Sequence, residues 1–121
     1  MSLDSYTYRN LISLIDKQIL LYEDYLKLQE KEREALKEAK INDLKECTIS
    51  RSNVLELIMV LKTKIAEILS NEGENKVSKL LNKYGTQEQR KRALMKVKKL
   101  RYLVKCTQGR AREYSELLDF S

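Results

Sequence analysis

The sequence predicts an all-α protein: a long antiparallel helical hairpin, a short helix and a third long helix, arranged as a three- or four-helix bundle or a coiled coil. The chain has no proline and only three glycines, so few residues interrupt a helix. Apolar residues recur every three or four positions over long stretches, and no alternating strand pattern occurs. With 121 residues, the chain is expected to form one helical domain over residues 1–121.

The first helix is expected over residues 5–40. One apolar face is formed at helical spacing by Tyr8, Leu11, Ile15, Tyr22, Tyr25, Leu28 and Leu36. Two polar residues, Gln18 and Glu32, interrupt this face. A second stripe with a seven-residue repeat lies beside it and consists of Ile12, Ile19 and Leu26. Two stripes predict a helix that packs against two neighbours, or against one neighbour and a bound partner.

The second helix is expected over residues 43–70, after the pattern resets near Asn42. Asp43 and Glu46 have the spacing of a capping box at its start. Arg51 is the one polar interruption of an apolar face formed by Leu44, Cys47, Val54, Ile58, Leu61, Ile65 and Ile68. The joint between the two helices contains neither glycine nor proline, so the sequence leaves open whether it is a turn or a kink.

Glycine-containing breaks frame a short helix expected over residues 76–84. The polar segment 71–75 contains Gly73, and Gly85 stands where a helix commonly ends in the left-handed conformation. Thr86 and Gln89 have capping-box spacing at the start of the last helix, which is expected over residues 87–118. Gly109 inside this helix is interpreted as a kink or as a close approach to another helix.

Several absences restrict the chemistry that the chain can perform. Without histidine there is no imidazole base and no zinc–histidine site. Cys47 and Cys106 are too few for a disulfide framework and are expected to be reduced thiols that are buried as small apolar side chains. No glycine-rich phosphate-binding loop is present. We therefore expect a protein that is not an enzyme and that holds no cofactor or metal.

The chain is also expected to stay out of the membrane. It has no run of about 18 apolar residues, the length that a spanning helix needs. Its first residues lack the basic and apolar regions of a signal peptide. Together with the reduced cysteines, these features predict a cytoplasmic location.

Basic residues gather in residues 89–112 of a chain whose net charge is +6, and this segment has no acidic residue. Such a block is a solvated face, a steering surface for an acidic partner or, with less support, a surface for nucleic-acid phosphates. Its basic residues alternate with apolar ones suited to packing, and no nucleic-acid-binding motif accompanies them. Tyr102 and Tyr114 in the same helix are interface candidates, because tyrosine combines an apolar ring with a polar tip.

Residues 11–62 resemble the FlgN family of flagellar type III export chaperones. The resemblance rests on residues 11–15 (LISLI), 22–26 (YEDYL), 32–36 (EREAL), 41–44 (INDL), 51–55 (RSNVL) and 57–58 (LI). In the family this order is a long helix, a glutamate-rich E-x-x-A-L segment, a short break, and a second helix with a basic residue before paired aliphatics. The family's asparagine-rich segment is missing, and residues 107–110 (TQGR) stand in its place.

The resemblance implies a cytoplasmic chaperone without ATPase activity. Such a protein binds the C-terminal amphipathic helix of hook-associated junction proteins, keeps them soluble and delivers them to the flagellar export gate. Client binding in the family lies on the C-terminal helix, about residues 94–120 here. The candidate client-binding residues are Leu94, Val97, Arg101, Tyr102, Val104, Lys105, Ala111, Tyr114, Leu117 and Leu118.

Other functions remain open from the sequence. The chain also fits a structural or adaptor coiled coil, including a chaperone of the filament cap. A basic helical protein that binds nucleic acid is the less supported alternative. The sequence does not decide between a monomer and a homodimer.

Overall fold

Four helices make up the described part of the chain. The computed structural model describes the backbone of residues 5–83 and 85–119 and the side chains of residues 6–83 and 85–109. The helices are α1 (Ser5–Lys37), α2 (Ile41–Asn71), α3 (Val77–Lys83) and α4 (Gln87–Asp119), and these ranges contain no strand. The predicted all-α fold is confirmed, and every observed helix end lies within three residues of the predicted one.

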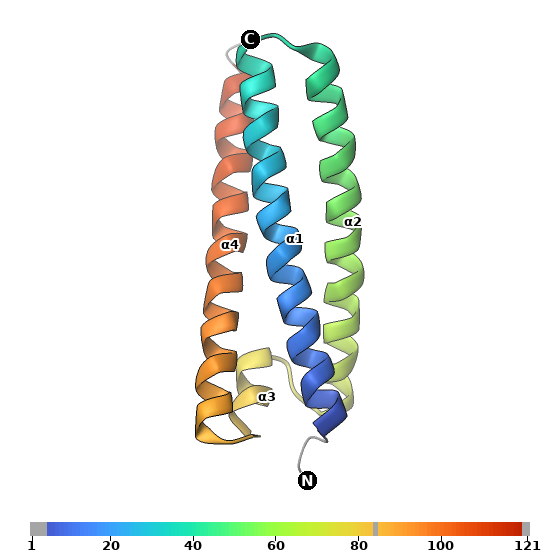
Figure 1. The fold of residues 1–121 in the computed structure, drawn as a ribbon, viewed down its shortest axis with the longest axis vertical. Helices are drawn as coiled ribbons and strands as arrows, with labels where there is room; N and C mark the ends of the chain where they lie inside the picture. The colour runs from blue at the N-terminus through green and yellow to red at the C-terminus, as the bar shows by residue number, and fades with distance from the viewer. Residues whose placement is uncertain (1–4, 84, 120–121) are drawn as a thin grey trace.

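The first helix, α1, lies between α2 and α4 and packs against both (Figure 1). α2 runs antiparallel to α1, so the predicted hairpin is present. α4 runs parallel to α1: Asp16 pairs with Lys96 at 3.0 Å, and further along both helices Gln29 donates to the Thr107 carbonyl at 3.1 Å. Among the described helices, no comparable packing joins α2 to α4. The three long helices therefore form an open arrangement with α1 at its centre.

A true turn joins α1 to α2, which settles the choice between turn and kink. The Lys40 N–H donates to the Ala35 carbonyl at 2.9 Å, and the Ala39 N–H donates to the Leu36 carbonyl at 3.2 Å. These two bonds are the Schellman pattern, which needs a left-handed residue after the helix. Ala39 has that conformation, with a φ of 55°. The turn thus forms without the glycine that usually makes it.

The predicted capping box at the start of α2 is wrong. α2 begins at Ile41, and Lys40, at the N-cap position, makes no capping hydrogen bond with its side chain. Because the Schellman turn already brings Lys40 to the helix start, Asp43 falls inside the first turn. There its carboxylate interacts favourably with the positive end of the helix dipole.

The end of α2 repeats the same turn with a glycine. The Glu74 N–H donates to the Leu69 carbonyl at 2.9 Å, and the Gly73 N–H donates to the Ser70 carbonyl at 3.1 Å. Gly73 has a φ of 70°, a conformation that costs glycine little because it has no Cβ. The break that the sequence predicts here is confirmed.

The start of α4 also agrees with the sequence. Gly85 has a φ of 85°, and a Cβ there would lie 2.9 Å from Gln89 Oε1. The Thr86 N–H donates to Gln89 Oε1 at 2.8 Å, and the Gln89 N–H donates to Thr86 Oγ1 at 3.1 Å, which is a complete capping box. The interpretation of Gly109 as a close helix approach is wrong. α4 continues through it, and no described atom of another element lies within 4 Å of where a Cβ would be.

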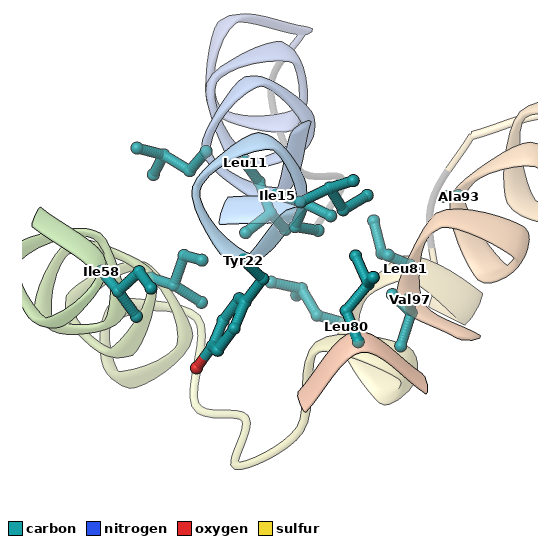
Figure 2. Packing of buried hydrophobic residues seen from close by; sticks show 12 residues of the cluster. Leu11, Ile15, Tyr22, Ile58, Leu80, Leu81, Ala93 and Val97 are labelled. Atoms are coloured by element: carbon teal, nitrogen blue, oxygen red, sulfur yellow. The ribbon is translucent and has the colours of Figure 1, made fainter. Parts of the chain in front are cut away.

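The apolar core lies in the half of the molecule that contains α3 (Figure 2). All four helices contribute to it, with Leu11, Ile15, Ile58, Leu80, Leu81, Ala93 and Val97 among its buried residues. Leu80 and Leu81 come from α3 and are fully buried. A helix as short as α3 is unstable alone in water, so this burial is what holds it in place.

Toward the α1–α2 turn the packing between helices becomes polar. Glu32 is only 2% exposed and pairs with Arg51, whose Nη1 also donates to the Tyr25 hydroxyl at 2.9 Å. Burial disfavours the charged guanidinium, but hydrogen bonds to Glu32 and Tyr25 outweigh this and raise the pKa of Arg51. Glu32 and Arg51 are therefore partners of each other. Each of them interrupts an apolar face in the sequence, Glu32 on α1 and Arg51 on α2.

Candidate helix-binding groove

An open groove follows the side of the molecule on which α2 and α4 fail to meet. α1 forms its floor with Ile15, Gln18 and Tyr22. Its two walls are Lys62, Ile65, Ala66 and Leu69 of α2 and Val97, Leu100, Arg101, Val104 and Lys105 of α4, and Lys76 and Val77 close one end. The cavity volume is about 570 Å³. We call this feature the α2–α4 groove.

The α2–α4 groove exists because α1 separates its two walls. Tyr22 projects from α1 toward the space between α2 and the α3–α4 side of the molecule (Figure 2). Ile65 and Val97 turn toward the same space from opposite walls and are nearly covered, being 8% and 7% exposed. An additional helix between the walls would cover Leu69, Leu100 and Val104, which are only half-buried. The interior is therefore apolar and shaped for an elongated apolar partner.

Basic side chains surround the apolar interior. Four lining residues are basic, namely Lys62, Lys76, Arg101 and Lys105, and they come from both walls and one end. No acidic residue lines the groove within the described part of the chain. Lysine and arginine stems add apolar area while their charged tips stay in water. The groove thus combines an apolar floor with a positive rim.

One polar side chain, Gln18, lies in the floor. It is 4% exposed and lines the groove between Ile15 and Tyr22. An amide group carries donor hydrogens and an acceptor oxygen, so Gln18 brings hydrogen-bonding groups into a largely apolar floor. In the sequence, Gln18 is an interruption of the apolar face of the first helix, and its position in the groove floor explains that interruption.

The structure brings only part of the predicted client-binding set to the groove. Val97, Arg101, Val104 and Lys105 line it. Leu94 and Tyr102 do not, and Tyr102 is 66% exposed elsewhere on α4. The remaining four candidates belong to α4, but their side chains lie outside the described residues: Ala111, Tyr114, Leu117 and Leu118.

The two apolar stripes of α1 leave open from the sequence whether one of them packs on a neighbouring helix or on a bound partner. The apolar face of α2 gives no indication of a role beyond the hairpin. Gln18 carried the available signal, because a polar residue within an apolar stripe marks a position that differs from the core. The basic residues Lys62 and Lys76 gave no comparable signal, since both resemble ordinary surface lysines.

The basic segment of α4 is divided among several surroundings rather than forming one uniform face. Lys96 pairs with Asp16 of α1, and Arg92 pairs with Glu88 at 2.7 Å. Arg90 donates to the Asn82 carbonyl at 3.2 Å. The rim residues Arg101 and Lys105 are exposed beside the groove. This division favours steering of a partner toward the groove over a continuous track for a phosphate backbone.

Tyr102 and Cys106 lie one turn apart on α4, away from the groove lining. A hydrogen bond with Cys106, and the charge of that thiol when ionised, raise the pKa of Tyr102. Both cysteines are free, and both are half-buried rather than buried as the sequence predicts.

Comparisons with known proteins returned no match to a family model, a curated protein or a solved structure. No described helix combines the length and the apolar character needed to cross a membrane. The described residues contain no group of three or more His, Cys, Asp or Glu side chains placed to hold a metal ion. Function is therefore inferred from the α2–α4 groove and from the resemblance of residues 11–62.

Proposed function

We propose that this protein is a chaperone that binds an amphipathic helix with acidic flanks in the α2–α4 groove. The observation that carries the proposal is the apolar groove with a wholly basic rim, left open because α2 and α4 do not pack together. A helix laid in a groove formed by helices is a common mode of peptide recognition.

The dimensions of the groove support a helical occupant. The lining residues extend from Lys62 to Leu69 on α2 and from Val97 to Lys105 on α4. Each stretch covers about two helical turns, or roughly 10 Å. A partner helix would place apolar residues at positions i, i+3, i+4 and i+7 against Tyr22 and the two walls. Its flanking carboxylates would lie near the four basic rim residues.

The resemblance of residues 11–62 to the FlgN family supports a narrower assignment. On this basis the client is the C-terminal amphipathic helix of a hook-associated junction protein, and the chaperone delivers it to the flagellar export gate from the cytoplasm. A structural adaptor or a filament-cap chaperone would use the same groove with a different partner. The resemblance covers α1 and α2, whereas Arg101 and Lys105 of the rim belong to α4.

Two synthetic peptides with identical apolar positions test the groove. One carries glutamates and the other lysines at the flanking positions, and fluorescence anisotropy measures binding to the full chain. We expect the acidic peptide to bind and the basic peptide to bind at least about tenfold more weakly, a difference of about 1.4 kcal/mol. Equal binding of both peptides, or binding of neither, would contradict the proposal.

Charge reversal on α4 locates the binding. We expect Arg101→Glu with Lys105→Glu to weaken the acidic peptide about tenfold or more, because two rim contacts become repulsive. Lys91→Glu with Lys98→Glu is the matched control, since both lysines are exposed on α4 and neither lines the groove. Net charge changes equally in the two variants, so equal weakening would mean that only the overall charge matters.

The flagellar assignment has its own test. A junction protein's C-terminal peptide, from the same organism, is titrated into the full chain and into the Arg101→Glu, Lys105→Glu variant. Binding to the parent chain that weakens in the variant supports both the groove and the client. If the designed acidic peptide binds and the junction peptide does not, the groove proposal stands and the flagellar assignment fails.

A further inference from the structure

One face of α4 carries an exposed stripe. Met95, Tyr102 and Gly109 follow one another at intervals of seven residues, which places them on the same side of the helix. Met95 is 65% exposed, Tyr102 is 66% exposed, and Gly109 is exposed as well. None of the three lines the α2–α4 groove, so a partner on this face goes beyond the proposed function. We call these three residues the α4 outer stripe.

Nothing in the described part of the chain requires a glycine at position 109. α4 continues through Gly109 as a helix, although a glycine inside a helix costs about 1 kcal/mol relative to alanine. Its backbone is not left-handed, and no described atom of another element lies within 4 Å of where a Cβ would be. Because glycine has no side chain, this exposed position lets a second backbone approach closely from outside the chain.

The charges along α4 change sign close to Gly109. Residues 89–112 contain no acidic residue. Residues 113–119 contain no basic residue, and their acidic residues are Glu113, Glu116 and Asp119. One continuous helix contains both segments. Two such helices attract each other when they run antiparallel, because each charged segment then meets the opposite one.

We propose that two copies of this chain form a dimer in which antiparallel α4 helices cross at Gly109. The two-fold axis lies within the interface, at right angles to the helices, and passes between the two Gly109 residues, so the two outer stripes face each other. Positions equally far from Gly109 then lie at the same level, with Tyr102 of one copy level with Glu116 of the other. Lys99 is likewise level with Asp119, about 15 Å along the helix from the crossing. A parallel arrangement would bring like charges together and is disfavoured.

Two basic side chains beside the outer stripe are available for this contact. Lys98 and Lys99 are exposed, and neither has an ion-pair partner among the described side chains. Lys96, by contrast, pairs with Asp16 of α1 at 3.0 Å. The two-fold axis repeats each contact between a basic and an acidic segment, as an isologous interface requires.

Sedimentation velocity over a concentration series tests the crossing at Gly109. We expect the full chain to dimerise, and Gly109→Leu to raise the dimer dissociation constant at least about tenfold, because the leucine keeps the two helices apart. No described atom of another element obstructs this side chain and leucine favours a helix, so circular dichroism should show no loss of helix. Ser52→Leu, at an exposed position of α2, is the matched control and should leave the dissociation constant unchanged.

Charge variants test the antiparallel orientation. Lys98→Glu with Lys99→Glu places acidic residues in both segments of α4, and Glu116→Lys with Asp119→Lys places basic residues in both. Each variant alone should dimerise more weakly than the parent chain, because like charges then meet. In a mixture of the two variants, opposite charges meet at both ends of the interface, so native mass spectrometry should detect a heterodimer.

Three results would overturn the proposal. They are a parent chain that stays monomeric throughout the concentration series, a Gly109→Leu variant that dimerises as tightly as the parent, and a mixture of charge variants without heterodimer. Glu56→Lys with Glu67→Lys, at exposed positions of α2, changes the net charge as Glu116→Lys with Asp119→Lys does and should not weaken the dimer. Because Gly109 does not line the α2–α4 groove, its variant should still bind the acidic peptide, so the two proposals can fail separately.

Discussion

Glu32 is the one acidic residue in the described part of the chain that is buried, and it lies at the α1–α2 interface with 2% of its surface exposed. Its burial is offset by Arg51, which also donates to Tyr25 and lies with its guanidinium carbon 5.6 Å from the centre of that ring. The arginine itself remains about a quarter exposed, so solvent screens part of the interaction. Together, Glu32, Arg51 and Tyr25 fix the alignment of α1 with α2 near the α1–α2 turn, where the two helices make few apolar contacts.

Removing one member of this pair is expected to destabilise the fold. We expect Glu32→Ala to lower the free energy of unfolding by about 1–3 kcal/mol, because the partly buried Arg51 loses its counter-charge. Urea denaturation followed by circular dichroism measures the change. Glu34→Ala is the matched control on the exposed side of α1 and should change stability by less than about 0.5 kcal/mol.

The double variant distinguishes pairing from burial alone. Replacing both Glu32 and Arg51 by methionine removes both charges while keeping apolar volume, and we expect it to be more stable than Glu32→Ala. The single variants Glu32→Met and Arg51→Met complete the comparison. If their losses in the free energy of unfolding add up to the loss in the double variant, the two residues are not coupled.

At the scale of helices and turns, α1 and α2 end in the same motif with different residues. Ala39 and Gly73 both have left-handed backbones, with φ of 55° and 70°. An L-residue with a Cβ is strained by about 1–2 kcal/mol in this region, and glycine is not. No described atom lies within 4 Å of a Cβ built on Gly73, so a substitution there would report on the backbone alone.

Exchanging alanine and glycine at these two turns should therefore have opposite effects. We expect Ala39→Gly to stabilise the protein by about 0.5–1 kcal/mol, since relief of strain exceeds the added entropy of the unfolded chain. Gly73→Ala should destabilise it by about 1 kcal/mol. Thermal denaturation of both variants measures the changes, and effects of the same sign would contradict the assigned turn geometry.

The sequence predicted the elements better than their arrangement. Helical spacing of apolar residues located all four helices, and Gly73, Gly85 and Thr86 marked their ends, because these signals are local. The turn at Ala39 could not be identified locally, since alanine seldom occupies a left-handed position. On α4, four of the five groove-lining residues are among the candidates named from the sequence. The lining on α1 and α2 depends on α4 packing beside α1 and away from α2, which no local pattern encodes.

At the scale of the whole molecule, the central position of α1 produces the α2–α4 groove. α2 and α4 pack on α1 without meeting each other, which leaves the α2–α4 groove open on one side. The exposed side chains of Leu20, Leu57 and Val60 lie on a different side of the same α1–α2 hairpin.

Methyl NMR spectroscopy during titration with the acidic amphipathic peptide tests the groove most directly. The methyl groups of Ile65, Leu69, Val97 and Leu100 line the groove. Those of Leu20 and Leu57 are exposed outside it and serve as an internal control. We expect the resonances of the first set to shift in proportion to bound peptide while those of the second set stay in place. Shifts confined to Leu20 and Leu57, or no shift at saturating peptide, would contradict the account.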